Sequence, residues 1–185
     1  IIADGPANGA DGSRVLMLAA DIVVVPVGPT MLDMESTRET IRILANARKV
    51  RQMSGGVGPK ALVVLNRLRN KKYTQTRDAF AAAQTLGEAV CPHALSTSDY
   101  IGDASGQRTT VWQMGYRAKR AATQMLSVIE EITEYGKQNA LEREAIEGSE
   151  ELRRKRDSQR TGDEAGTREP GDPDSAEYRI AVGAE

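Results

Sequence analysis

The chain has 185 residues, of which 39% are hydrophobic and 28% are charged, and its formal net charge at pH 7 is −1. This length suffices for one domain with a sizeable core, and no apolar run approaches the roughly 18 residues of a membrane-spanning helix. The single cysteine, Cys91, excludes an internal disulfide and fits a reducing cytoplasm, and with His93 as the only histidine the chain cannot build a Cys/His metal site.

The predicted elements alternate between strand and helix along the first part of the chain. Strands are expected where β-branched and apolar residues run together, and helices where apolar residues recur every three or four positions. In chain order the predictions are a strand ending at 1–4, a helix at 13–20, a strand at 21–26, a helix at 36–53, a strand at 61–65, a helix at 76–86, a strand at 89–92 and a long helix at 110–135.

Two details of these helices are also predicted. Ser36 or Thr37 is a plausible N-cap for the second helix. Trp112 and Met114 stand at helical spacing in the last helix, where we expect them in the core rather than at a ligand. The alternation as a whole indicates an α/β fold with a parallel sheet and helices on both of its faces.

Charge divides the chain near Gly136. Residues 1–136 carry 16 Lys and Arg against 13 Asp and Glu, whereas residues 137–185 carry 9 against 13 and contain few apolar side chains. We therefore predict a folded domain over 1–136 and a charged, largely disordered tail over 137–185, with a solvated helix possible at 139–156. The basic run at 153–156 either touches a nucleic acid or, more simply, is a solvated stretch balanced by the acidic pair before it.

Three predicted strands end in polar or turn-forming residues: Asp4, Pro26 and Asn66. Ligands bind at the carboxyl ends of strands in open parallel sheets. An Asp after a strand is also an ordinary turn former, so this pattern alone does not establish a site.

Read together and in order, four stretches resemble the ParA/MinD family of deviant-Walker P-loop ATPases. They are IIADGPANG (1–9), LAADIVVVPVGPTMLDMEST (18–37), ALVVLNRL (61–68) and CPHALSTSDYIGDASGQRTTVWQM (91–114). The resemblance covers roughly residues 1–135, and its middle stretch is closest to the ParA branch, which partitions plasmids and chromosomes. It implies a parallel-sheet P-loop NTPase fold of the SIMIBI type.

The resemblance assigns candidate roles to single residues. Asp4 would be the Walker B carboxylate, which positions Mg²⁺, usually through a water. Pro6 and Gly9 would belong to the loop beside the γ-phosphate of ATP. Asn66 would recognise adenine, or else cap a turn at the strand end. Asp33 would lie near a dimer face or cap the following helix, and capping is the simpler expectation.

The family's phosphate-binding loop, a glycine-rich loop with two lysines, is not among these residues. The stretch SGGVGPK (54–60) lacks its Lys-Ser or Lys-Thr ending and is expected to stop a helix instead. We therefore expect the chain to be a fragment whose N-terminal strands and P-loop are missing. It would be inactive alone, although the full-length protein would hydrolyse ATP.

The resemblance also implies partners: a homodimer formed with ATP, a ParB-like adaptor that stimulates hydrolysis, and non-specific DNA in a nucleoid-associated, cytoplasmic setting. Arg117, Lys119 and Arg120 would contact DNA phosphates, unless they form a solvated helix face. The basic loop at 67–73 is similarly ambiguous. No membrane contact is expected, because the residues at 176–185 form no amphipathic basic helix. The alternatives are a MinD-like protein with another cargo and a non-catalytic interaction scaffold.

Overall fold

The computed structural model describes residues 1–5, 11–69 and 74–166. The described chain falls into two compact units, of which the first is Ile1–Arg143 and the second begins at Glu144. The first unit contains the sheet and its core. The described part of the second unit is helical throughout, as far as Gly166.

The first unit alternates helix and strand, as the hydrophobic pattern predicts. In chain order the elements are α1 (Asp11–Ala19), β1 (Ile22–Val27), α2 (Met31–Met53), β2 (Lys60–Leu65), α3 (Thr74–Gln84), β3 (Ala89–Val90), α4 (Asp99–Gly106), the 3₁₀ helix η1 (Tyr116–Ala118) and α5 (Lys119–Gly166), which continues into the second unit.

The three strands form one parallel sheet in the order β1-β2-β3. The register pairs Val27 with Leu65, so β1 and β2 end at the same edge of the sheet. The α/β class and the parallel sheet predicted from the sequence are confirmed. Strand β2 is buried on both faces, which is the usual state of a strand inside a parallel sheet, whereas β1 buries Val25 and Val27 and leaves Val24 and Pro26 exposed.

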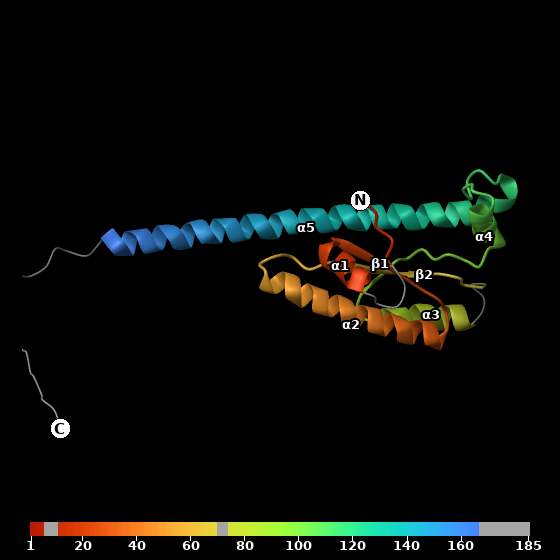
Figure 1. The fold of residues 1–185 in the computed structure, drawn as a ribbon, viewed down its shortest axis with the longest axis horizontal. Helices are drawn as coiled ribbons and strands as arrows, with labels where there is room; N and C mark the ends of the chain where they lie inside the picture. Colours follow the sequence, from red (N-terminus) through yellow and green to blue (C-terminus); the bar gives the residue numbers. More distant parts are fainter. Residues whose placement is uncertain (6–10, 70–73, 167–185) are drawn as a thin grey trace, which may run out of the picture. The chain divides into compact units, whose positions relative to one another are not determined.

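Helices cover both faces of the sheet (Figure 1). On one face, Val63 and Leu65 pack with Met34 of α2 and Ala83 of α3. On the other face, Leu62 and Val64 pack with Val128 of α5 and with Cys91. Because side chains alternate along a strand, neighbouring residues of β2 supply the two cores.

The first unit extends past Gly136. Asn139 of α5 is only 2% exposed, and its side-chain nitrogen donates a hydrogen bond of 3.2 Å to the carbonyl of Asp21. Arg143 forms an ion pair with the carboxylate of Asp21. The hydroxyl of Tyr135 donates to the carbonyl of Ala61 at 3.2 Å. These contacts hold this part of α5 to the start of the sheet.

The predicted strand at 1–4 is wrong. Residues 1–5 form no regular structure, and the side chains of Ile1 and Ile2 are fully exposed. A strand needs a neighbour to accept and donate its backbone hydrogen bonds, and β1 pairs with β2 alone among the described strands. The apolar pattern of residues 1–3 does not by itself supply that neighbour.

Two predicted helix starts are also wrong. The N-cap of α2 is Thr30, several residues before the predicted Ser36 or Thr37. The predicted helix at 110 begins instead with turns and η1, and α5 starts at Lys119. In consequence Trp112 lies outside a helix and is 50% exposed, so it is not the core residue that helical spacing predicts.

Helix α5 includes the predicted extension at 139–156 and continues through Gly166. Its residues 144–156 are exposed, as expected of a solvated charged helix. Disorder was predicted for all residues after 156, and this prediction is wrong for 157–166, which continue the helix; residues 167–185 lie outside the described part of the chain.

Candidate functional site

The carboxyl ends of β1 and β2 meet at one edge of the sheet and carry the candidate site. The backbone N–H of Asn66 donates to the carbonyl of Val27 at 2.8 Å, which extends the strand pairing by one residue. Both chains then leave the sheet together. This is the edge at which open parallel sheets bind ligands.

Five residues at this edge form what we call the strand-end cluster: Gly28, Thr30, Asp33, Asn66 and Arg67. Thr30 and Asp33 make a reciprocal capping box at the start of α2. The Thr30 hydroxyl oxygen accepts from the backbone N–H of Asp33 at 3.1 Å, and the hydroxyl donates to Asp33 Oδ2 at 2.6 Å. The prediction that Asp33 caps a helix is confirmed.

Asp33 also joins the two strand ends. Its Oδ1 atom lies 3.1 Å from Nη2 of Arg67, 34 positions further along the chain. Hydrogen bonds from Thr30, together with the positive charge of Arg67, hold the pKa of the Asp33 carboxyl below its ordinary value of 3.8. The carboxylate is therefore ionised throughout the neutral pH range.

Gly28 provides the space for this carboxylate. A Cβ atom at position 28 would stand 2.3 Å from Asp33 Oδ2 and 2.9 Å from Arg67 Nη2. Both distances are shorter than any real contact of a Cβ atom. The approach of the ion pair to the end of β1 therefore requires glycine at this position.

Asn66 and Arg67 form a tight turn after β2. The Asn66 Oδ1 atom accepts from the backbone N–H of Arg67 at 2.8 Å, and Arg67 adopts a left-handed backbone with φ of 56°. The Thr97 hydroxyl donates to the Arg67 carbonyl at 3.0 Å, which ties the turn to the segment after β3. Asn66 thus makes the turn-capping contact that was one of its two predicted roles.

This turn leaves part of the Asn66 side chain available. Among the described residues, no partner is recorded for its two amide N–H donors, and its oxygen retains a second lone pair. The residue is half-buried at the sheet edge. Its amide can therefore still donate to, and accept from, a flat polar ligand.

Of the other residues predicted at this site, Asp4 alone lies among the described residues. Asp4 is exposed in the irregular segment before α1, and none of its contacts with the described residues is a hydrogen bond or ion pair. Pro6 and Gly9 lie outside the described residues. Nowhere in the described ranges do three or more His, Cys, Asp or Glu gather as metal ligands. As a ligand for Mg²⁺, Asp4 is accessible, but it belongs to no such group within the described residues.

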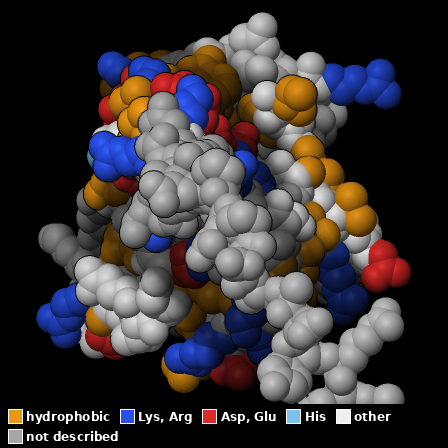
Figure 2. Space-filling view, turned by 90° about the vertical axis from the view of Figure 1, so that its left-hand side faces the viewer, with side chains coloured by type: hydrophobic (Ala, Val, Ile, Leu, Met, Phe, Trp, Pro, Cys, Tyr) orange, Lys and Arg blue, Asp and Glu red, His pale blue; other side chains and the backbone are white. Residues whose placement is uncertain are grey.

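The candidate DNA-binding residues lie elsewhere, at the junction of η1 and α5. Arg117, Lys119 and Arg120 are all exposed. On the parts of the face in Figure 2 that grey atoms leave uncovered, Lys and Arg side chains are interspersed with Asp, Glu and hydrophobic side chains.

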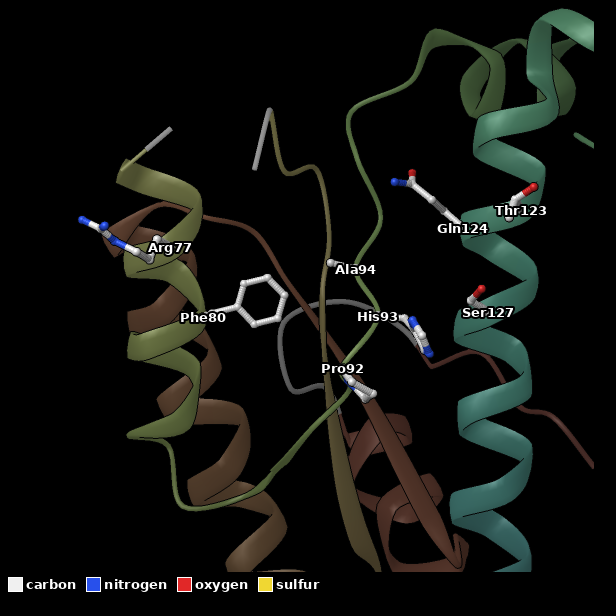
Figure 3. A pocket seen from close by; sticks show the side chains of 8 residues that line it. All are labelled: Arg77, Phe80, Pro92, His93, Ala94, Thr123, Gln124 and Ser127. Atoms are coloured by element: carbon white, nitrogen blue, oxygen red, sulfur yellow. The ribbon is translucent and has the colours of Figure 1, made fainter. Parts of the chain in front are cut away.

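A cavity of about 370 Å³ lies between α3, the segment after β3 and α5 (Figure 3). Its lining residues are Arg77, Phe80, Pro92, His93, Ala94, Thr123, Gln124 and Ser127. In Figure 3 Arg77 points away from the other labelled side chains, whereas His93 points from the segment after β3 toward α5. The two basic side chains therefore do not point at a common position, as they would in a site that binds a phosphate through both.

Sequence reasoning missed three members of the strand-end cluster: Gly28, Thr30 and Arg67. The signal for Thr30 was present, because Thr-x-x-Asp at 30–33 is a capping-box pattern placed directly after a proline. Arg67 and Gly28 had no comparable signal. Their role depends on the pairing of two strands that are far apart in sequence.

Within the described residues, no helix combines the length and apolarity needed to cross a membrane. No family model matches the chain. A curated protein named "Maintenance of carboxysome distribution protein A", from Halothiobacillus neapolitanus, is 26% identical over 117 residues. That match covers 63% of this chain and 51% of the relative, so the chain spans about half of the relative's length.

A solved structure described as "Partition Protein" is 14% identical, with a TM-score of 0.42, and the match covers 64% of this chain and 30% of the other. This structural likeness is too low to carry an argument. The sequence similarity to the carboxysome distribution protein is more informative, and at a coarse level it agrees with the ParA-like resemblance. The chain is thus similar, over part of its length, to a protein named for distributing a cellular body.

Proposed function

We propose that this chain is part of a ParA-like ATPase that positions a cellular cargo. The observation that carries the proposal is the placement of Asn66 at the carboxyl edge of a parallel sheet, with its amide donors available. The sequence similarity to a carboxysome distribution protein supports the same conclusion independently.

The proposed ligand is Mg-ATP. Asn66 would hold adenine, because a side-chain amide offers both a donor and an acceptor to the base edge. Asp4 would hold a Mg²⁺-bound water, and the metal would neutralise charge on the phosphates. Pro6 and Gly9 would lie beside the γ-phosphate. A lysine-bearing phosphate loop is required as well, and it would have to come from chain outside these 185 residues.

The proposed cycle couples ATP to assembly. ATP would support a homodimer that binds DNA non-specifically through Arg117, Lys119 and Arg120, and a ParB-like adaptor would stimulate hydrolysis. The cargo would be a plasmid or chromosome. The relative's name favours a second candidate, a large protein body carried by the same cycle.

Hydrolysis tests the ATPase proposal. The product of the complete reading frame would be assayed for Mg²⁺-dependent ATP hydrolysis, alone and with DNA. Asp4→Ala should reduce the rate by about 10- to 100-fold, as for other residues that act on a metal through an outer-shell contact. Asp11→Ala is the matched control, because Asp11, the first residue of α1, is also an exposed carboxylate. An inactive wild type, or equal loss in both variants, would contradict the proposal.

DNA binding is tested separately. Replacing Arg117, Lys119 and Arg120 by alanine should weaken duplex binding and reduce the slope of log K against log salt by about 2 to 3, since each phosphate contact contributes about 0.9. The three side chains are exposed, so the fold should be unaffected. An unchanged salt slope would show that DNA does not bind through these residues.

A further inference from the structure

The segment between α4 and α5 exposes two aromatic rings. Trp112 is 50% exposed and Tyr116 is 88% exposed. Both precede α5 and stand four residues apart in a turn-rich stretch. Single exposed apolar residues are common on proteins, but two large aromatic side chains in one short segment suggest an interaction surface.

Hydrogen bonds hold this segment in a defined shape. The Gln113 side-chain oxygen accepts from the Thr109 hydroxyl at 2.9 Å and from the backbone N–H of Thr110 at 3.2 Å. Arg108 and Gly115, on either side, have left-handed backbones with φ of 54° and 77°. The neighbouring side chain of Val111 is buried. The rings are therefore presented from a fixed support rather than from a loose loop.

Four cations lie close to the rings in sequence: Arg108, Arg117, Lys119 and Arg120. All four are exposed, and within the described residues none of them forms an ion pair. Arg120 makes one weak polar contact, 3.5 Å from the Ser96 hydroxyl. Tyr116 lies three and four positions before Lys119 and Arg120, so these three share one face of the η1–α5 junction.

We propose that this aromatic-basic surface, defined by Trp112, Tyr116 and the four cations, binds single-stranded nucleic acid. The cations hold the phosphates, and unpaired bases stack on the two rings. The inference rests on the proposed nucleic-acid contact of Arg117, Lys119 and Arg120. It adds that unpaired strands are preferred over duplex.

The chemistry of the surface favours this occupant. A duplex covers the faces of its bases, so exposed rings contribute nothing to duplex phosphate binding, whereas every unpaired base offers a face for stacking. A second copy of the chain, docked through the same surface, would place its four cations against the four of the first copy, and these like charges would repel. A membrane surface is usually bound by a longer amphipathic helix, and here only two large apolar side chains project from the segment.

The chain carries its own reporter, because Trp112 is the only tryptophan. Its fluorescence would be titrated with oligothymidine and with a duplex of equal length. Base stacking on the ring should quench the emission at saturation, and the single strand should bind about tenfold more tightly. With four phosphate contacts, the salt slope for the single strand should be near −3, at about 0.7 per contact.

Two variants of Tyr116 separate stacking from charge. Tyr116→Ala should weaken single-strand binding about tenfold and leave duplex binding unchanged, whereas Tyr116→Phe should retain binding because it keeps the ring. The side chain is 88% exposed, so neither variant should disturb the fold. Circular dichroism confirms this in the same samples.

Each outcome is decisive. Duplex binding as tight as single-strand binding, without quenching, would overturn the preference for unpaired bases and leave the proposed DNA contact standing. Absence of binding to either would overturn the inference, whereas the proposed duplex contact of the ATP-bound homodimer is decided by the separate salt-slope assay. A blue shift of Trp112 emission with vesicles containing anionic lipid, in place of any response to oligonucleotide, would assign the surface to a membrane and refute the inference.

Discussion

Replacing Thr30 by alanine removes the hydroxyl that organises the strand-end cluster. The change deletes the acceptor for the Asp33 backbone N–H and the donor to Asp33 Oδ2. Loss of an N-cap costs about 1 kcal/mol, and loss of the partly exposed bond to the carboxylate should add about 0.5 to 1 kcal/mol. We therefore expect the free energy of unfolding to fall by about 1.5 to 2 kcal/mol.

This loss can be measured by thermal and urea unfolding, followed by circular dichroism. At about 2.1 cal/mol/K per residue, unfolding of Ile1–Arg143 carries an entropy near 0.3 kcal/mol/K, so the midpoint of thermal unfolding should fall by about 5 to 7 °C. Thr40→Ala is the matched control. Its hydroxyl bonds only to the Ser36 carbonyl within α2, and we expect a change of less than about 0.5 kcal/mol. Equal effects of the two variants would refute the capping argument.

Three further predictions concern the same fold. Gly28→Ala should lower the free energy of unfolding, measured with urea, by about 1 to 3 kcal/mol, because the added Cβ meets the Asp33 carboxylate. Gly102→Ala, at a position with open space around it, should be neutral or stabilising. Because the pKa of Asp33 is lowered in the folded state, its stabilisation is present at neutral pH and lost as pH falls below about 3.8. Wild type should therefore lose more stability than Asp33→Asn between pH 7 and pH 3, and parallel acid curves would contradict this. Arg48→Met should lower the free energy of unfolding by about 2 kcal/mol, because the Glu88 carboxylate, whose side chain is 11% exposed, loses its two guanidinium hydrogen bonds of 2.6 and 2.8 Å. Adding Glu88→Gln to this variant should restore part of the lost stability. No recovery would count against the pairing.

The sheet could be predicted from the sequence because its signal is local. The runs DIVVVP and ALVVL are apolar on both faces, and the structure confirms strands at Ile22–Val27 and Lys60–Leu65. The segment IIAD also begins with a run of apolar residues, but it forms no strand. A strand also requires a neighbour, and composition does not report one.

The candidate site could be predicted only in part, for the same reason. Asn66 and Asp33 were identified because each follows a recognisable local pattern. The ion pair of Asp33 with Arg67 joins positions 34 residues apart and exists only once β1 and β2 are aligned. The exposure of Trp112 was missed because the helix was expected to start too early. Helical spacing then predicted burial for a residue that lies in a turn.

The central claim is that the carboxyl edge of the sheet binds a nucleotide through Asn66, and Asn66→Asp tests it most directly. Aspartate keeps the oxygen that accepts from the Arg67 N–H, so the turn is preserved, but it lacks the amide donors. Asn46→Asp, at an exposed position on α2, is the matched control. The measurement is calorimetric binding of Mg-ATP to the product of the complete reading frame. Our account predicts that wild type and Asn46→Asp bind alike and that Asn66→Asp binds about tenfold more weakly. Equal affinity in all three proteins, or no binding by wild type, would contradict it.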